Sequence, residues 1–366
     1  MTATSATAVL IDGYELSASG FRGIGTYLRH LVAGLSARDD VDVTVLATDG
    51  TALPSGAQRR SLHRPGPARW RDRQHDWRLP SDLARARPTG VVLSPGRTPP
   101  ARSPVPFVHT LHDLTPLVVD TGQLRAEQRH WTRVGARLRD AHRIVAVSHA
   151  TADTAMRLLG VDATRIVVIP HGVDPSLHAD PAERADAPPV LLWVSSWGPH
   201  KGLADAIAVI DALADAGQPH ELHIAGWNDA WMRAQVDATI ATAKHRERVR
   251  VRGYVDDIGA LYRSASALLV TSRSEGFCLP AAEAMACGTP VVAYDNTAIP
   301  ELVGDAGVLV PDGDPAAFAR AVEALLRDRA EADDRALRGL ARARSLTWEA
   351  STAAHAEVLR SAIAAG

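Results

Sequence analysis

The sequence lacks the features that place a protein in a membrane or outside the cell. Cysteine is scarce: only Cys278 and Cys287 occur among 366 residues. Two cysteines cannot build a cysteine metal cluster, and their scarcity is typical of a reducing compartment. No apolar run is long enough to span a bilayer, and the first residues carry no basic and apolar export signal. We therefore expect a cytoplasmic protein.

An excess of charge of one sign is also missing. Lys and Arg number 40 against 42 Asp and Glu, so the formal net charge is −2. No overall basic field therefore suits the chain to nucleic acid. The hydrophobic content of 46% is enough for a sizeable core. At roughly 150 residues per domain the length allows two domains and excludes a small binding module.

Short runs rich in Val, Ile and Leu alternate with Ala-rich helical stretches along the whole chain. Strands are expected at residues 8–11, 41–46, 90–93, 107–110, 144–147 and 166–169, and again at 190–194, 221–225, 249–252, 267–271, 290–293 and 307–309. This alternation is the pattern of buried parallel strands with crossover helices. A polar stretch with several prolines, His171–Pro189, is the expected interdomain linker. We predict an α/β fold of two doubly wound parallel sheets.

Two stretches depart from the balanced charge. Arg59–Arg87 contains nine arginines with Trp70 and Trp77, which indicates an exposed basic loop. Gly122–Asp140 is expected to form an amphipathic helix, with arginines four residues apart on one face: Arg125, Arg129, Arg133 and Arg137. Such a face could contact an anionic membrane, here the inner face of the cell membrane, or an anionic acceptor. An ordinary solvated helix face is the simpler interpretation.

The sharpest local signal lies after the expected strand 267–271. Gly276 allows a backbone turn close to a ligand, and Pro280 suits the first turn of a helix. Backbone amides at a helix start bind phosphate or anionic oxygen. Glu275 precedes this helix and Glu283 lies inside it, so the two carboxylates can hold different hydroxyl groups of one elongated ligand, such as a nucleotide sugar. On spacing alone, a helix-start charge and a solvated residue explain the pair equally well.

The residues around the two glutamates decide between these interpretations. Residues 272–292, 298–303 and 307–310 closely resemble the E-x7-E region of the retaining glycosyltransferases of family 4. That family has the GT-B fold, in which two Rossmann-like domains face an interdomain cleft. The resemblance implies that Glu275 contacts the hydroxyls of the donor sugar and that Glu283 contacts the nucleotide ribose. It also implies that the turn and its amides hold the sugar and phosphate: Gly276, Phe277, Cys278 and Leu279.

Segments of the first half resemble the same family in the expected order. The residues Gly23, Ile24 and Gly25 open a helix, as the family's glycine loop does against the donor diphosphate. A nicotinamide-binding loop is the alternative, but the third glycine of its fingerprint is missing. His112 follows the expected strand 107–110 and resembles the histidine that approaches the donor sugar near its reactive region. We expect His109, two residues earlier, to be structural.

Lys201 lies just before an expected helix of the second half and resembles the family's diphosphate-binding lysine. A departing diphosphate needs positive charge in a site that excludes water. Many members have an arginine five residues earlier, where this chain has Ser196. A subset that resembles bacterial mannosyl- and rhamnosyltransferases has a small hydroxyl residue there. Arg273 or His200 is the alternative source of charge. Tyr254 and Val255 match the stretch whose backbone holds the nucleotide base.

The resemblance implies a retaining hexosyltransferase that needs neither a metal nor a cofactor. Its donor would be a nucleotide-diphosphate sugar, with GDP-mannose as the first candidate. Its acceptor would be a hydroxyl on a sugar, a glycolipid or a small molecule, in polysaccharide or glycolipid assembly. Four alternatives stay open: a transferase acting on a small natural product, a nucleotide-sugar epimerase, a non-catalytic nucleotide-sugar-binding protein and a nicotinamide oxidoreductase.

The same resemblance predicts how the chain is divided. Residues 1–172 would form the acceptor-side Rossmann-like domain, and residues 173–349 the nucleotide-sugar-binding one. The Ala-rich stretch 350–366 is helical by propensity. It is expected to pack back on the first domain.

Overall fold

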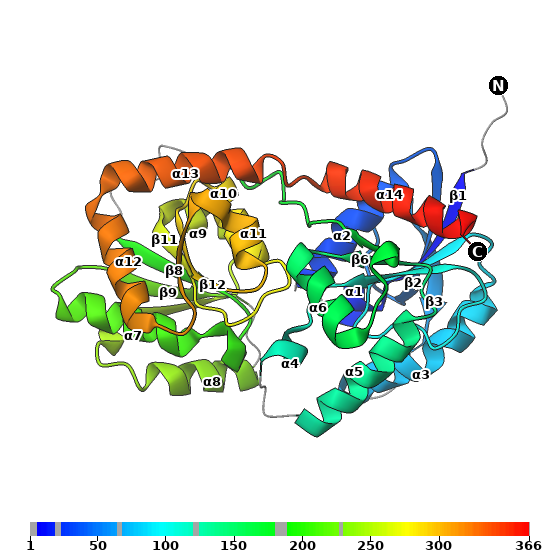
Figure 1. Ribbon diagram of the computed structural model, residues 1–366, viewed down its shortest axis with the longest axis horizontal. Coiled ribbons are helices and arrows are strands. Elements are labelled where there is room, and N and C mark those ends of the chain that lie inside the picture. Colours follow the sequence, from blue (N-terminus) through cyan, green and yellow to red (C-terminus); the bar gives the residue numbers. More distant parts are fainter. Residues whose placement is uncertain are drawn as a thin grey trace. The chain divides into compact units, whose positions relative to one another are not determined.

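The computed structural model describes residues 6–18, 23–63, 68–119, 124–179, 189–226 and 230–365. The chain divides into two compact units, of which the first comprises Met1–Gly172 with Trp348–Gly366 and the second Val173–Thr347. Each unit holds one parallel sheet with its own helices (Figure 1). Of the expected linker, residues 180–188 lie outside the described part of the chain. No helix in the described ranges is both long and apolar enough to span a membrane.

The first unit has a seven-stranded sheet in the order β3-β2-β1-β4-β5-β6-β7, and its described neighbours all pair in parallel. The strands are β1 (Thr7–Asp12), β2 (Val41–Thr48), β3 (Gln58–Leu62), β4 (Val91–Ser94), β5 (Phe107–Leu111), β6 (Arg143–Ala146) and β7 (Ile166–Val168). Its helices are α1 (Tyr14–Ala18), α2 (Gly23–Ser36), α3 (Ala68–Ala86), α4 (Thr115–Val118), α5 (Leu124–Leu138), α6 (His149–Leu159) and α14 (Trp348–Ala364).

Apolar side chains alternate along these strands and build a core on each face of the first sheet. On β1, Val9 and Ile11 belong to one core and Leu10 to the other, as the two-residue period of a strand requires. The core that contains Val9 is closed by α2 and α14, and the core that contains Leu10 is closed by α3 and α5. The C-terminal helix α14 therefore packs within the first unit, beside α2.

The basic stretch Arg59–Arg87 is not the exposed loop that its composition predicts. It contributes the edge strand β3 and the helix α3, with residues 64–67 outside the described part of the chain. Leu79 and Leu83 of α3 are completely buried against the sheet. These two buried leucines are enough to pack the helix against the sheet, although arginine is the commonest residue type in it.

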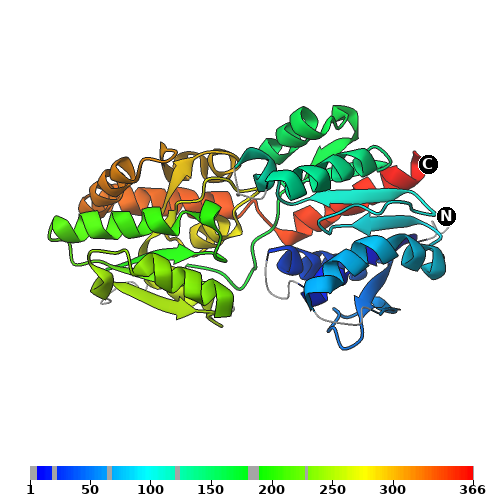
Figure 2. The ribbon, with the colours of Figure 1, turned by 90° about the horizontal axis from the view of Figure 1, so that it is seen from below.

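The second unit has a six-stranded parallel sheet in the order β10-β9-β8-β11-β12-β13. Its strands are β8 (Val190–Val194), β9 (Glu221–Ala225), β10 (Val249–Gly253), β11 (Ala265–Val270), β12 (Val291–Asp295) and β13 (Gly307–Pro311). Its helices are α7 (Leu203–Asp215), α8 (Ala230–Ile240), α9 (Ile258–Ser264), α10 (Leu279–Ala286), α11 (Ile299–Val303), α12 (Pro315–Arg327) and α13 (Arg329–Ala343). In the view from below, helices flank the arrows of each sheet (Figure 2).

Both sheets have the strand order of a doubly wound α/β fold. In the second unit the order reverses between β8 and β11, which pair directly although their first residues, Val190 and Ala265, are 75 positions apart in the sequence. Ligands of such sheets bind outside the carboxyl ends of the strands at this switch point. The predicted fold class is confirmed, because each unit is a Rossmann-like parallel sheet covered by helices.

Candidate active site

The predicted lysine and the first predicted glutamate meet at the switch point of the second sheet. Lys201 follows β8, and Glu275 follows β11, the strand that pairs with β8. The loops that leave two neighbouring parallel strands emerge at the same edge of the sheet. Strand pairing therefore brings together two residues that lie far apart in the sequence.

The lysine loop is held against the end of β11 by a buried threonine. The Thr271 hydroxyl donates to the carbonyl oxygens of Lys201 and Gly202, at 3.1 and 2.8 Å, and accepts from the Trp193 indole N–H at 3.1 Å. Gly202 has a φ of +70°, and a Cβ there would collide with the carbonyl oxygen of Thr271. Only glycine allows this close approach. The position of Lys201 is thus fixed by its neighbours on both sides.

Lys201 and Glu275 form an ion pair with two short contacts. The Lys201 ammonium lies 2.9 Å from each carboxylate oxygen of Glu275, and the two side chains are only 15% and 14% exposed. The Glu275 backbone N–H donates to the Thr297 hydroxyl at 3.0 Å. The pair places one cation and one hydrogen-bond-accepting carboxylate side by side at the sheet edge.

Helix α10 begins directly after this pair, as the Gly-Pro pattern predicts. Its N-cap residue Cys278 has a φ of +75°, so the left-handed residue of the turn is Cys278 rather than Gly276. A non-glycine residue in this conformation costs free energy and is found most often at functional sites. Phe277 and Cys278 are buried, and Pro280 lies in the first turn of α10. Burial raises the pKa of the Cys278 thiol, which keeps it protonated.

Glu283 has a partner that sequence reasoning missed. The Tyr262 hydroxyl of α9 donates to Glu283 Oε2 at 2.8 Å, and Tyr262 is completely buried. Burial raises the pKa of the Glu283 carboxyl, the hydrogen bond from Tyr262 lowers it, and the charge of Asp174 raises it. One feature of the sequence points to such a contact: Tyr262 lies in a short apolar helix, and a buried tyrosine hydroxyl needs a polar partner.

Arg273, one of the two alternative sources of charge for the diphosphate, is engaged elsewhere. Its guanidinium pairs with Asp205 at 2.7 Å and Asp312 at 3.4 Å, and it lies over the ring of Tyr294, 5.0 Å from the centroid. Its backbone N–H donates to the carbonyl oxygen of His200 at 2.7 Å. Arg273 therefore braces the lysine loop, and Lys201 is the cation at the predicted diphosphate position.

Ser196 follows β8, and Tyr254 and Val255 follow β10, so all three lie at the same edge of the sheet as Lys201 and Glu275. Ser196 is half-buried, and Tyr254 is 49% exposed. Their neighbours Ser195, Trp197 and Gly253 line a small hollow together with residues of β9 and α8. The hollow lies beside the stretch that is predicted to hold the nucleotide base.

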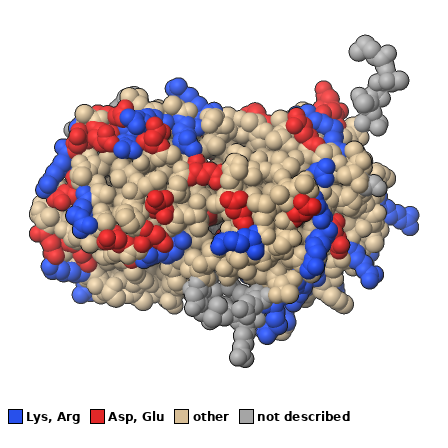
Figure 3. All heavy atoms as spheres, viewed as in Figure 1, with Lys and Arg blue, Asp and Glu red and all other residues tan. Residues whose placement is uncertain are grey.

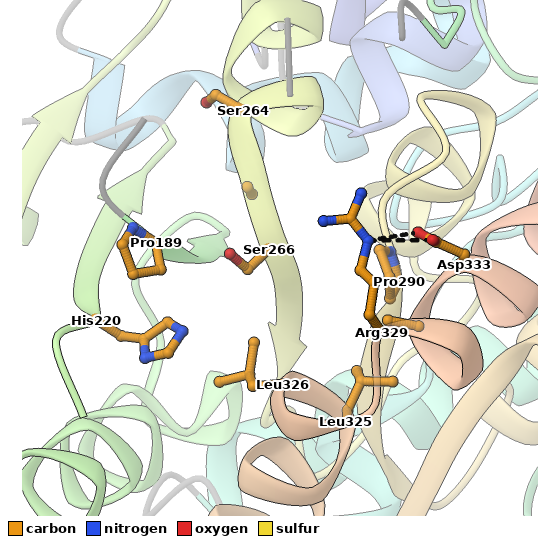
Figure 4. Close-up of a pocket in the computed structure, with 11 residues that line it drawn as sticks. Pro189, His220, Ser264, Ser266, Pro290, Leu325, Leu326, Arg329 and Asp333 are labelled. Atoms are coloured by element: carbon orange, nitrogen blue, oxygen red, sulfur yellow. Dashed lines mark hydrogen bonds and ion pairs between the residues drawn. The ribbon is translucent and has the colours of Figure 1, made fainter. Parts of the chain in front are cut away.

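A separate hollow opens at the opposite, amino edge of the second sheet (Figure 4). Two prolines, Pro189 and Pro290, stand at the starts of their strands there and offer no backbone N–H to a ligand. At its rim Arg329 pairs with Asp333 at 3.0 Å. None of the predicted site residues lines this hollow.

In the first unit, Gly23, Ile24 and Gly25 open α2, as predicted, and Tyr27 of this helix lies against His112. The ring centroids of Tyr27 and His112 are 4.6 Å apart, and His171 lies 5.4 Å from His112. His355 of α14, which lies in no recognisable motif, joins this group: its Nε2 lies 2.9 Å from the Tyr27 hydroxyl. These residues form a compact group under the glycine loop.

Hydrogen bonds fix the protonation of this group. His355 Nδ1 lies 2.7 Å from the carbonyl oxygen of Ser351, which can only accept, so Nδ1 carries the proton and Nε2 accepts from Tyr27. His112 hydrogen-bonds the backbone of Pro95, and its Nε2 has no hydrogen-bond partner among the described residues. We call the four buried histidines that share this environment the first-unit histidines: His109, His112, His171 and His355.

Burial keeps the first-unit histidines neutral. Desolvation is the largest cause in each case, and it lowers the pKa of His109 and of His171 to about 3 and that of His355 to about 4. It also lowers the pKa of His112 well below its ordinary value, with His171, His109 and His355 adding to the effect. Within the described ranges, no group of three His, Cys, Asp or Glu side chains could hold a metal ion.

Two parallel Rossmann-like sheets, each with the doubly wound strand order, are the architecture of the GT-B fold. Residues 21–177 match the family described as Glycosyltransferase Family 4, and residues 188–328 match the one described as Glycosyl transferases group 1. The chain belongs to this glycosyltransferase family.

Relatives and solved structures agree with that assignment. The D-inositol 3-phosphate glycosyltransferase of Thermomonospora curvata is 30% identical over 89% of this chain and 79% of its own length. The O-antigen chain mannosyltransferase B of Escherichia coli is 29% identical, and the aligned part spans 59% of each of the two proteins. The sucrose-phosphate synthase of Thermosynechococcus elongatus has the same fold, with a TM-score of 0.83, 21% identity and coverage of 98% of this chain and 100% of that one.

Proposed function

We propose that this chain is a retaining hexosyltransferase that transfers mannose from a nucleotide-diphosphate sugar, GDP-mannose first, to a hydroxyl acceptor in polysaccharide or glycolipid assembly. The observation that carries the proposal is the Lys201–Glu275 pair at the switch point of the second sheet. The name of the Escherichia coli relative, a mannosyltransferase of O-antigen chains, supports the choice of sugar and of product class.

The two residues of the pair suit the two groups that the breaking bond joins: Lys201 suits the diphosphate, and Glu275 suits the sugar. A diphosphate that departs carries negative charge, and a cation fixed beforehand in a site of low polarity stabilises that charge without reorganisation. Glu275 would exchange one contact with Lys201 for a sugar hydroxyl, while the ammonium turns its remaining protons to the phosphate. The first amides of α10 add donors for the same oxygens.

Glu283 would hold the ribose as a hydrogen-bond acceptor. A buried carboxylate that keeps its charge can accept from two hydroxyl groups at once. Tyr262 already satisfies one oxygen of this carboxylate and leaves the other for the nucleotide. The tyrosine therefore acts as a positioning residue for Glu283.

The proposed reaction keeps the configuration at the anomeric carbon. The bond from that carbon to the diphosphate breaks, and a bond to the acceptor oxygen forms on the same face of the sugar. The acceptor's proton passes to the departing diphosphate oxygen. No carboxylate on the opposite face is needed, as it would be in a double displacement. From the first unit, His112 Nε2 would accept a hydrogen bond from a hydroxyl group, because the neutral ring carries its single proton on the other nitrogen, which donates to the Pro95 carbonyl oxygen.

The test is proton NMR of the product formed from GDP-mannose and a hydroxyl acceptor, with a chelator present. We expect an α-linked product from the α-linked donor, at an undiminished rate. The Lys201→Met variant should lose the activity, and Lys244→Met, which changes an exposed lysine of the same unit, should keep it. A β-linked product would refute retention. Activity that disappears with the chelator and returns with Mg²⁺ or Mn²⁺ would refute metal independence.

A further inference from the structure

One helix of the first unit exposes two tryptophans among arginines. On α3, Trp77 is 78% exposed and Trp70 is 48% exposed. Residues seven apart lie on one face of a helix, about 10 Å from each other along its axis. Arg73 lies over the Trp70 ring at 5.8 Å, and Arg78 and Arg85 line one hollow with Trp77. Large apolar side chains are thus presented to solvent in a cationic setting.

The three acidic residues of α3 offset only part of the charge of its five arginines. Asp72 accepts from the Tyr14 hydroxyl at 2.7 Å, and Asp76 accepts from Thr98 at 3.1 Å. Asp82 pairs with Arg85 at 3.0 Å, which neutralises one arginine of the helix. The charge of the exposed face is therefore set by the remaining arginines.

Helix α5 extends the basic surface. It lies beside α3 over the same face of the first sheet, and Asp76 of α3 is within electrostatic range of Arg133 and Arg137 of α5. Arg129 and Arg133 are exposed, and Arg137 donates to the carbonyl oxygen of Pro99. Figure 3 shows Lys and Arg side chains gathered over the region of α5. The side chain of Arg125 lies outside the described part of the chain.

The apolar side of α5 is not available for insertion into a membrane. Trp131, Val134 and Leu138 are buried in the core of the first unit. An amphipathic helix that lies in a bilayer needs a free apolar face. Of the two faces of α5, only the one that carries the arginines is therefore open to a membrane.

We propose that α3 and α5 together form a docking surface for an anionic lipid bilayer, with Trp70 and Trp77 at the headgroup level and the arginines on lipid phosphates. The chemistry of both residue types matches that location. Tryptophan is enriched at membrane interfaces because its ring is apolar with one polar N–H, and exposed arginines are attracted to anionic lipid. This surface goes beyond the proposed transfer reaction and does not depend on it.

A protein partner is the rival occupant, since tryptophan and arginine also dominate protein interfaces. The core of such an interface is depleted of charge and continuously apolar. Here arginines flank both tryptophans on the helix face, and further arginines cover the neighbouring helix. Two separate rings in a broad cationic field fit the mixed polarity of a headgroup layer better than the core of a protein interface.

The experiment is sedimentation of the full chain with vesicles of phosphatidylcholine and phosphatidylglycerol, against phosphatidylcholine alone. We expect binding only to the anionic vesicles, weakened by added salt because exposed charges are screened. The double variant Trp70→Ala/Trp77→Ala should bind at least about tenfold more weakly, since each ring loses apolar contact with lipid. Each arginine removed by Arg129→Gln or Arg133→Gln should cost about fivefold.

Matched controls come from the second unit. Leu337→Ala removes a side chain that is 66% exposed on α13, and Arg320→Gln removes an exposed charge on α12. Both should bind vesicles like the unchanged protein. All variants should keep their melting temperature and the shift that a nucleotide sugar induces, which separates this surface from the transfer reaction.

Three results would overturn the proposal. These are no binding to anionic vesicles, equal binding to both kinds of vesicle, and binding that the tryptophan variant leaves unchanged. Concentration-dependent self-association that the same variant abolishes, with no vesicle binding, would instead assign the surface to a second copy of the chain.

Discussion

Replacing Tyr262 with phenylalanine isolates one hydrogen bond of the site. The ring stays in its buried position, and only the contact between the hydroxyl and Glu283 Oε2, 2.8 Å long, is lost. A hydrogen bond to a charged group contributes about 1.5–3 kcal/mol. If the bond positions Glu283 for the ribose, the dissociation constant of the nucleotide sugar should rise about ten- to a hundredfold. Titration calorimetry with the donor measures this directly.

The same variant has a pH signature that a purely structural tyrosine would lack. The hydrogen bond from Tyr262 lowers the pKa of Glu283, so its removal raises that pKa. A smaller fraction of Glu283 is then ionised at any given pH. Donor affinity should therefore begin to fall at a higher pH in the variant than in the unchanged protein.

Tyr294→Phe is the matched control for this experiment. Its hydroxyl also donates to a carboxylate at 2.8 Å, that of Asp205, and the residue is completely buried in the same unit. Both variants should lose a similar amount of stability, about 1.5–3 kcal/mol, because each loses one hydrogen bond to a carboxylate. If Tyr262→Phe binds donor within twofold of the control and with the same pH profile, the positioning role of Tyr262 is refuted.

Three further predictions concern the ion pair, the histidines and the thiols. Lys201→Met leaves Glu275 without its partner and should lower the free energy of unfolding in urea by about 1–3 kcal/mol. The double variant Lys201→Met/Glu275→Gln should regain this stability but not donor binding. Equal stability of the single and the double variant would contradict a structural ion pair. Burial lowers the pKa of His109 and of His171 to about 3 and that of His355 to about 4. The stability that these three neutral histidines provide is therefore complete above pH 6.5 and is lost as the pH falls below it, by about 2 kcal/mol each at pH 5. Hydrogen exchange should show the first unit opening before the second on acidification, and the reverse order would refute this. Cys278 and Cys287 are buried free thiols, so a thiol reagent should label them in urea and not in the native protein, and fast native labelling would contradict the burial.

The regular part of the fold is predictable because buried parallel strands are almost continuously apolar. The run Val190–Val194 is buried on four of its five residues and was located without error. The edge strand β3 and the helix α3 were missed for the opposite reason. β3 exposes four of five residues, and α3 holds its place with two leucines among arginines, so neither carries a clear hydrophobic period.

The candidate site residues could be predicted because their neighbours in the sequence carry a recognisable pattern. Glu275 and Lys201 each lie in a loop after a strand, and Glu283 lies in helix α10, which follows the Glu275 loop; glycines and a proline mark both loops. Their partners could not be found in this way. Tyr262 and His355 touch the site residues through folding alone, from helices whose sequence contains no motif. A contact between segments that are distant in the sequence depends on how their helices and strands pack against each other. No local motif in a single sequence shows this packing.

Donor-induced thermal stabilisation tests the central claim most directly. The protein would be melted without metal in the presence of GDP-, UDP-, ADP- and TDP-sugars, beside Glu283→Ala and the shape-matched Glu283→Gln. At a hundred times its dissociation constant, a ligand adds about 2.7 kcal/mol to the stability. We predict that one donor, GDP-mannose, raises the melting temperature clearly and that both variants reduce this shift. No shift with any donor, or a shift unchanged by both variants, would contradict a nucleotide-sugar site at Glu283.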